Sequence, residues 1–132
     1  MHLKIITHDK IVFDNEVDEI YTKGVDGEFG ILKGHTPIVS ALDIGVTRVV
    51  KEGKYSHFTT MGGVFQFKEN AATILTDSAE LGSDIDVTRA KAAKERAEAR
   101  IAEHDTSIDI KRAEASLSRA IARLKVSLAS KS

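Results

Sequence analysis

The feature that most constrains this chain is a C-terminal stretch, residues 85–128, that contains no glycine and no proline. All nine glycines, the single proline and all seven aromatic residues precede it. Alanine and charged residues dominate the stretch, and six of the seven arginines lie at or after Arg89. Such residues favour helix, and nothing here interrupts one. The stretch is therefore predicted to be helical, and its arginines need an explanation.

A polar interruption at residues 104–107 predicts a turn between two helices. The first runs from about Ile85 to Glu103 and the second from about Ile108 to Leu128. Each arm repeats small or aliphatic residues at spacings of three and four, so each has one apolar stripe. Long arms and a short loop predict an antiparallel helical hairpin. The stripes comprise Ala90, Ala93, Ala97 and Ile101 on the first arm and Ile110, Ala113, Leu117, Ala120, Ile121, Leu124 and Leu128 on the second.

The start of the first helix carries capping residues, and its seam consists mainly of alanine. Ser83 and Asp86 resemble a capping box, and Asp84 is the alternative cap. Alanine allows close approach of helices but buries little area, at roughly 25 cal/mol per Å². The hairpin is therefore expected to be only marginally stable when detached, and to be able to dissociate from the rest of the protein.

The arginines of the two arms are expected to face one another. Arg89 and Arg96 are seven residues apart and share a face, about 10 Å apart along the axis. Arg119 and Arg123 are neighbours on the second arm. One interpretation is a solvated face with ion pairs along each helix. The other is a polyphosphate clamp, because guanidinium groups match phosphate oxygens and stay charged. Asp86 could then accept a hydrogen bond from a ribose or an adenine amine.

The charge distribution argues against nucleic acid as a partner. The net charge is −1, with most acidic residues in residues 1–84 and a modest basic excess in residues 85–132. The basic side chains alternate with glutamates, and no aromatic residue of this half could stack on a base. A small nucleic-acid-binding module is the least favoured alternative.

Several other classes of site lack support in the sequence. The chain has no cysteine, so disulfides and thiolate metal sites are not expected. No apolar run approaches the roughly 18 residues that span a bilayer, and Met1–Lys4 does not begin a signal peptide. The five histidines are scattered, and no stretch resembles a nucleophile elbow. We expect a non-catalytic cytoplasmic protein without a metal site, and a protein docked on a membrane complex would look the same.

The first 84 residues read as short strands separated by turns. Residues 46–50 and 55–60 alternate and are joined by residues 51–54, which predicts a hairpin. Gly62-Gly63 is expected to break the chain before the next strand. Eight to ten strands at this spacing predict an antiparallel β-sandwich or barrel. The expected fold class is thus a β sandwich plus α, with a sandwich domain at residues 1–84 and a helical hairpin at 85–132.

One loop, residues 24–37, is denser in glycine than the rest. Its glycines at 24, 27, 30 and 34 match neither a dinucleotide fingerprint nor a Walker loop. One interpretation is a tight, twisted pair of hairpins that needs positive φ. The alternative is a rigid exposed loop that presents Glu28 and His35 to a partner.

Three motifs in this order resemble the epsilon subunit of bacterial F-type ATP synthase. They are residues 27–37, Gly62-Gly63-Val64, and Ile85-Asp86-Val87-Thr88-Arg89-Ala90, and the resemblance covers nearly the whole chain. It implies a non-catalytic central-stalk subunit at the cytoplasmic face of the membrane. Its implied partners are the gamma subunit and the c-ring through the sandwich, and the alpha and beta subunits through extended helices. No membrane insertion is implied, and the isolated chain is expected to be a monomer.

The resemblance also implies site residues and a regulatory ligand. ATP, with or without magnesium, is expected to bind as a regulator and to favour the folded hairpin; scarce ATP would release the helices to inhibit ATP hydrolysis. The alternative is a purely structural coupling subunit that binds no nucleotide. The implied ATP-binding residues are Glu80, Ile85, Asp86, Arg89, Ala90, Arg96, Arg119 and Arg123, and the implied partner-binding residues are Glu28, His35, Arg100 and Arg112.

Overall fold

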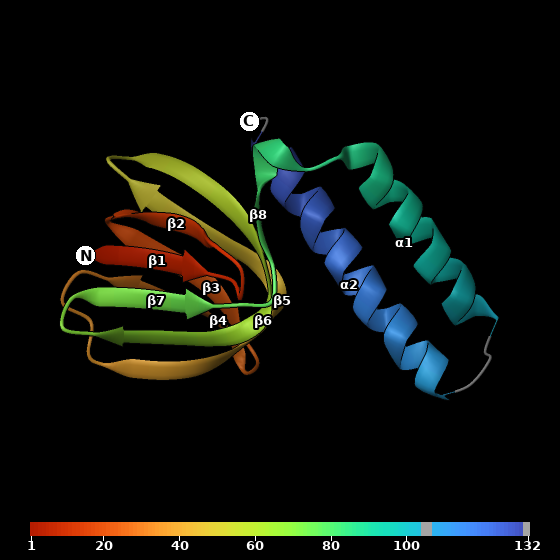
Figure 1. Cartoon of the computed structure of the whole chain (residues 1–132), viewed down its shortest axis with the longest axis horizontal. Coiled ribbons are helices and arrows are strands. Elements are labelled where there is room, and N and C mark those ends of the chain that lie inside the picture. Colours follow the sequence, from red (N-terminus) through yellow and green to blue (C-terminus); the bar gives the residue numbers. More distant parts are fainter. Residues whose placement is uncertain (104–106, 131–132) are drawn as a thin grey trace.

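A computed structural model describes residues 1–103 and 107–130, with only the backbone described for residues 107–109. Its order of elements is a run of strands followed by a 3-10 turn and two helices, which confirms the expected β sandwich plus α (Figure 1). The strands are β1 His2–Ile6, β2 Ile11–Glu16, β3 Glu19–Gly24, β4 Gly27–Leu32, β5 Ile38–Lys51, β6 Lys54–Lys68, β7 Ala71–Leu75 and β8 Ala79–Leu81. The 3-10 turn η1 is Gly82–Asp84, and the helices are α1 Val87–Ala102 and α2 Ser107–Ser130.

The strands form one sheet that curls over on itself into a sandwich (Figure 1). The strand order is β2-β1-β7-β6-β5-β3-β4, and β8 pairs with β6 off this path. Only β1 and β7 run parallel; the other described pairs are antiparallel. The hairpin expected at residues 46–60 is confirmed as part of the long β5–β6 pair. These two strands take part in both layers and connect them.

The expected break at Gly62-Gly63 is wrong. Strand β6 continues through both glycines, which take φ of 75° and 115°. The register with β5 is the same on both sides of the glycines, with Ile44 opposite Met61 and Leu42 opposite Gly63, so neither strand contributes an extra residue here. A Cβ on Gly63 would lie 1.9 Å from the Leu75 carbonyl oxygen. The glycines therefore lie within a continuous strand, where positive φ and the close approach of the Leu75 backbone exclude a larger residue.

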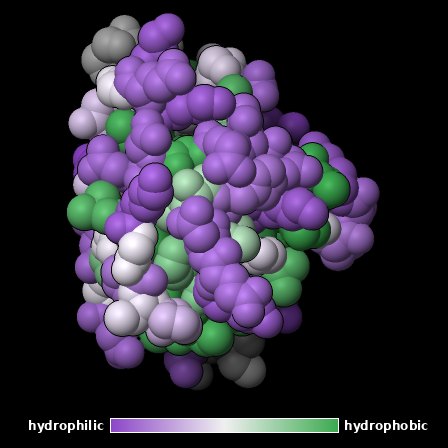
Figure 2. Space-filling model, turned by 90° about the vertical axis from the view of Figure 1, so that its left-hand side faces the viewer, coloured by the Kyte–Doolittle hydropathy of each residue, from purple (hydrophilic) through white to green (hydrophobic). Residues whose placement is uncertain are grey.

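Large aliphatic and aromatic side chains fill the sandwich, with Phe65 at its centre. On the side of the sandwich away from the helices, Figure 2 shows a mostly hydrophilic surface with hydrophobic residues gathered in a hollow near its middle. Neither helix, over its described residues, is long and apolar enough to cross a bilayer. The fully buried side chains of the core include Leu3, Ile5, Ile20, Ile31, Phe65 and Ile74.

The helices form the expected antiparallel pair, and α2 lies between the sandwich and α1 (Figure 1). Helix α1 begins after Asp86, whose carboxylate accepts a hydrogen bond from the Arg89 backbone N–H at 3.0 Å. The prediction of Ser83 or Asp84 as the cap is therefore wrong, because Gly82–Asp84 forms a separate 3-10 turn. The expected turn at residues 104–107 falls mostly outside the described residues.

Helix α2 buries two faces, whereas its sequence suggested one. Leu128, assigned to the apolar stripe, is 70% exposed, while Ala122 and Val126 are buried. Val126 packs with Ile85 and Ala90 in a small apolar cluster beside Val46 of β5. A helix packed between a sheet and a second helix presents apolar residues to both neighbours, so a single stripe described it incompletely.

Candidate functional site

A pocket of about 470 Å³ lies where the end of the sandwich meets both helices. We call it the junction pocket. Its walls come from three segments: β8 with η1, the first turns of α1, and one residue of α2. Polar side chains dominate the lining, with a small apolar part on α1. The lining residues are Glu80, Asp84, Ile85, Asp86, Arg89, Ala90, Ala93, Arg96 and Arg123.

A second cavity of about 300 Å³ continues from the first between the two helices. We call it the interhelical pocket; it shares Ala93, Arg96 and Arg123 with the junction pocket. Arg119 lines it from α2. The two adjoining cavities together are therefore lined by all eight residues expected to bind ATP. The remaining lining residues of the interhelical pocket are Ala97, Arg100 and Ser116.

Helix geometry explains this convergence. Arg89 and Arg96 lie two turns apart on α1, so both point toward the same side of that helix. Arg119 and Arg123 lie one turn apart on α2 and face α1 across the seam. Alanines at the seam, Ala97 among them, let the helices approach closely enough for both pairs to line the same cavities.

One of these arginines is paired with an acidic residue of the sandwich. The Arg123 Nε donates a hydrogen bond to Glu80 Oε1 at 2.7 Å, and the two side chains are only about a third exposed. Glu80 belongs to β8, where its own backbone N–H donates to the Thr59 hydroxyl at 3.0 Å. This ion pair ties α2 to the edge of the sandwich across the junction pocket.

The other arginines are less well compensated. The Arg119 Nη2 donates to the Ser116 hydroxyl at 3.0 Å, a neutral partner on its own helix. Within the described part of the chain, no carboxylate forms an ion pair with Arg89, Arg96 or Arg119. The two pockets are lined by five arginines and three carboxylates, of which only Glu80 is paired with one of these arginines, and this positive excess favours an anion that carries several negative charges.

Asp86 has a structural duty that the sequence did not reveal. One of its carboxylate oxygens accepts the Arg89 N–H as the helix cap. Its other oxygen makes no hydrogen bond within residues 1–103 and 107–130, and the residue lines the junction pocket. One oxygen remains free to accept from a ligand without unmaking the cap.

The size and chemistry of the site suit a nucleotide. Ligand pockets usually measure about 300–1,000 Å³, and the junction pocket falls in that range. Guanidinium groups suit phosphate oxygens, free carboxylate oxygens accept from amino or hydroxyl groups, and Ile85, Ala90 and Ala93 offer apolar contact to a flat ring. No group of His, Cys, Asp or Glu among the described residues is arranged to hold a metal ion.

The residues expected to contact partners are dispersed. Glu28 lies on β4 opposite Lys23 of β3. His35 follows that strand, and its Nδ1 lies 2.6 Å from the Thr36 carbonyl oxygen. Arg112 is exposed on α2, whereas Arg100 lines the interhelical pocket beside Arg119. In the described contacts these four residues do not form one surface.

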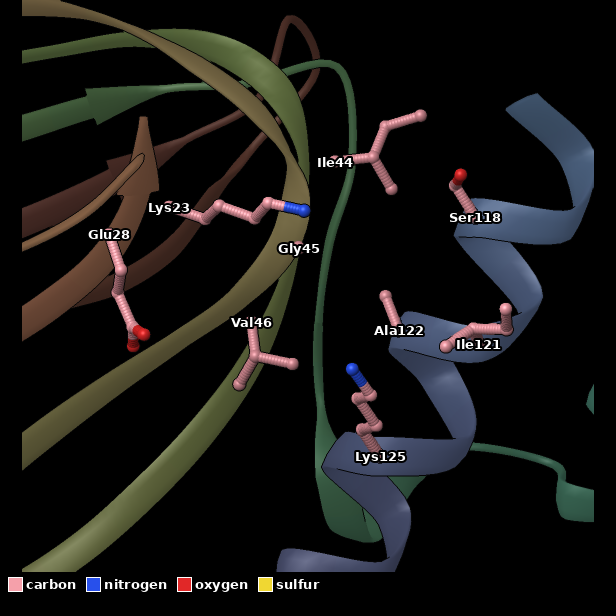
Figure 3. Close-up of a pocket in the computed structure, with 9 residues that line it drawn as sticks. All are labelled: Lys23, Glu28, Ile44, Gly45, Val46, Ser118, Ile121, Ala122 and Lys125. Atoms are coloured by element: carbon pink, nitrogen blue, oxygen red, sulfur yellow. The ribbon is translucent and has the colours of Figure 1, made fainter. Parts of the chain in front are cut away.

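Glu28 also borders a third cavity of about 520 Å³ between the sheet and α2. Figure 3 shows the ammonium groups of Lys23 and Lys125 directed into the space between β5 and α2, with Glu28 on the sheet side. The cavity is lined largely by small or apolar residues of β5 and α2. It marks incomplete packing of α2 on the sandwich.

Three polar residues that line the two pockets, Arg100, Ser116 and Asp84, were not among the residues that the sequence assigned to the candidate site. Arg100 lies one turn beyond Arg96, so its spacing already placed it on the same helix face. Ser116 lies three residues before Arg119, which is also a helical neighbour. Asp84 had no comparable signal, because its position depends on the 3-10 turn that follows β8.

Two family models together match residues 1–127 of the chain. Residues 1–82 match the beta-sandwich domain of the ATP synthase Delta/Epsilon chain. Residues 83–127 match the long alpha-helix domain of the same chain. The resemblance read from the glycine loop and the Ile85–Ala90 motif is thereby confirmed.

Curated relatives agree with this assignment. The ATP synthase epsilon chain of Nitratidesulfovibrio vulgaris (strain DP4) is 44% identical over 103 residues, covering 78% of this chain and 77% of that protein. The ATP synthase epsilon chain of Desulforamulus reducens is 46% identical over 99 residues, covering 75% of each.

Solved structures show the same fold. A chain of the Euglena gracilis mitochondrial ATP synthase, in a structure of OSCP, F1 and the c-ring, matches with a TM-score of 0.83 and 27% identity over 96% of this chain and 79% of that one. A chain from the central stalk and c-ring of the Tetrahymena thermophila enzyme has a TM-score of 0.62 at 14% identity, and so shows the fold alone. Together with the family matches, these findings establish that the chain belongs to the Delta/Epsilon chain family of ATP synthase.

Proposed function

We propose that this chain is a non-catalytic epsilon subunit of the ATP synthase central stalk, and that ATP regulates it by binding between the sandwich and the helices. The family match carries the first part of the proposal. The convergence of Arg89, Arg96, Arg119 and Arg123 on two adjoining cavities, which share Arg96 and Arg123, supports the second. The subunit acts as a peripheral part of the membrane complex.

In the complex, the sandwich docks on the gamma subunit and the c-ring, with Glu28 at the ring contact and His35 nearby. Solved relatives that occur in assemblies with F1 and the c-ring support this placement. The helices reach the alpha and beta subunits when they leave the sandwich. Exposed Arg112, together with Arg100 and Arg119 once the hairpin opens, then meets acidic segments of beta.

ATP stabilises the folded posture. Its phosphates offset the repulsion among the arginines, and Glu80, Asp84 and Asp86 line the junction pocket where the rest of the nucleotide would be recognised. Magnesium would accompany the phosphates without a protein ligand of its own. A ligand that binds only this posture, at a hundred times its dissociation constant, stabilises it by about 2.7 kcal/mol.

The hairpin is suited to such control. Its seam is mainly alanine, and a cavity remains beneath α2, so its docking on the sandwich is weak relative to the sandwich core. A stabilisation of about 2.7 kcal/mol is then enough to shift the population from extended to folded helices. When ATP is scarce, the released helices extend along gamma and stop rotation in the direction of ATP hydrolysis.

Calorimetric titration of the isolated chain with ATP, with and without magnesium, tests the nucleotide part of the proposal. Arg89→Ala and Arg123→Ala should each weaken ATP binding by about tenfold or more, because each removes a charge-assisted hydrogen bond to phosphate. Lys91→Ala is the matched control, since it removes one exposed charge from α1 outside both pockets.

The same titration decides against the alternative. If neither arginine variant changes ATP affinity, the clamp assignment fails. If titration of the unsubstituted chain with ATP gives no heat of binding, with or without magnesium, the subunit is a purely structural coupling element. The clamp is supported if the arginine variants are folded, as judged by circular dichroism, and bind ATP more weakly than Lys91→Ala.

A further inference from the structure

A second arginine site lies on the sandwich, outside the nucleotide cavity. The Arg48 guanidinium on β5 lies 4.5 Å from the centre of the Tyr21 ring and 5.7 Å from that of Tyr55. The Tyr55 ring stacks in turn on His57, with centroids 6.4 Å apart and planes 22° apart. These residues come from three neighbouring strands, β3, β5 and β6. We call them the tyrosine-arginine patch.

Strand pairing places the patch on the outer face of the sheet. Tyr21 and His57 both lie directly opposite Arg48, so the three side chains share a face. Val46, two residues before Arg48, is on that face too and packs against α2. Helix α2 therefore covers the face up to Val46, while Tyr55 is 60% exposed beyond it.

The patch is held rigidly. The Tyr21 ring lies across Gly30, where a Cβ would come within 2.8 Å of two ring carbons. The Tyr21 hydroxyl donates to Glu19 Oε1 at 2.6 Å. Cation–π contact with two rings restrains the guanidinium, so less side-chain entropy is lost when it binds a partner.

Arg48 nevertheless has no acceptor. Within residues 1–103 and 107–130, nothing accepts a hydrogen bond from its guanidinium, and its Nε is buried without a partner. A native arginine with an orphaned buried donor calls for an explanation. Burial, and then the Arg48 charge, lower the pKa of His57, so that this imidazole is neutral and supplies no competing charge.

We propose that the tyrosine-arginine patch docks a protein segment of another subunit, and that an aspartate or glutamate of that segment receives the Arg48 guanidinium. Tyrosine and arginine dominate the binding energy of protein interfaces, especially where they are pre-organised. Leu32 lies beside the patch, opposite Glu19 on β4, and is 52% exposed, which adds apolar area for the flank of such a segment.

The local charge favours a carboxylate over a phosphate or a lipid headgroup. Arg48 is the only cation within the patch, and the carboxylate of Glu19 lies beside Tyr21. A polyanion would be repelled by the Glu19 carboxylate, whereas a single carboxylate can pair with the one guanidinium group of Arg48. The patch is thus distinct in its preference from the arginine cluster of the nucleotide site.

Reconstitution of the full chain into ATP synthase stripped of this subunit tests the proposal. Arg48→Gln should weaken binding by about tenfold or more, the effect of losing an interface hot spot. Tyr55→Ser, at an exposed side chain, should weaken it in the same direction. Lys68→Gln removes an equal charge from the far end of β6 and should change affinity by less than about threefold. Thermal unfolding of each free variant confirms that it is folded.

Cross-linking identifies the partner group. Arg48→Lys places an amine at the patch, and a water-soluble carbodiimide should join it to the partner carboxylate as an amide with loss of water. Mass spectrometry of the reconstituted complex should find this link, and not one from position 48 to the chain's own Glu19 alone. Unchanged affinity of both Arg48→Gln and Tyr55→Ser overturns the proposal. Arg48-dependent binding to anionic lipid vesicles, without a protein cross-link, also overturns it.

Discussion

The sandwich and the helical hairpin bury different kinds of side chain. The sandwich closes around Phe65, Leu3 and Ile5, each without measurable exposure. The hairpin buries mainly alanines, such as Ala97 and Ala113, and one valine, Val126. Buried area sets the hydrophobic contribution, so the sandwich is stabilised by its own core. The hairpin depends on contacts with the sandwich and on the balance of charge at its seam, which is what a movable element requires.

The largest expected effect is on the sandwich. Phe65→Ala should lower the free energy of unfolding by about 3–5 kcal/mol, because it removes a fully buried ring and its edge-to-face contact with Phe29. Urea unfolding followed by circular dichroism measures this. Val64→Ala, next to it but 42% exposed, is the control and should cost less than about 1 kcal/mol. An equal loss of unfolding free energy in the two variants would contradict the expected difference between a buried and an exposed side chain.

A smaller effect should fall on the hairpin alone. A Cβ at Gly82 would lie 1.8 Å from Ser130 Oγ and 2.5 Å from the Val126 carbonyl oxygen, so Gly82→Ala should displace the end of α2. The expected cost to docking is about 1–3 kcal/mol. Hydrogen exchange should accelerate in α2 and stay unchanged in β1 to β7. Ser83→Ala, at the exposed neighbouring position, should leave both unchanged.

The prediction fails if exchange accelerates equally in both parts. That outcome would mean that the sandwich relies on the docked hairpin for its own stability.

The smallest effect concerns pH and belongs to the sandwich alone. Hydrogen bonds to Asp14 and then Glu16 raise the pKa of exposed His2 above 6.5. The protonated form is favoured in the folded state, so its contribution is present below the unfolded pKa and disappears as pH rises through the folded pKa. NMR titration should show the raised pKa, and His2→Gln should flatten this part of the stability profile.

His8→Gln is the control for this titration, since the His8 ring hydrogen-bonds to no described residue. If the pH dependence of stability is the same in His2→Gln and in the unsubstituted chain, His2 does not contribute to it and the prediction is wrong. The rate of hydrogen exchange in α2 should be the same in His2→Gln, in His8→Gln and in the unsubstituted chain.

Residue patterns predicted most of the architecture, and the errors have physical causes. The contrast between a glycine-containing first part and a glycine-free second part sufficed for the fold class. A single apolar stripe predicts that Leu128 is buried, but this side chain is exposed because α2 packs against two neighbours with two different faces. The Gly62-Gly63 pair predicts a break in the chain, and only the pairing with β5 and β7 shows that β6 continues through it.

The candidate site was predictable where helix periodicity governs it. Spacing alone placed Arg89 and Arg96 on one face, and Arg119 and Arg123 on another. The link from Glu80 to Arg123 required the position of β8 relative to α2, whereas the Asp86 cap is a local contact with Arg89, three residues on. Contacts between distant segments leave no periodic trace in either segment.

By itself, the sequence determined the kinds of element and the faces they bury, because propensity and periodicity are local properties of the chain. It also carried the motifs that identify the family. Only the tertiary structure decided that the arginine pairs meet at two adjoining cavities and that Arg48, a lone arginine in a strand, is held between two tyrosines. Both depend on strand register and helix docking, which arise from packing across the whole molecule.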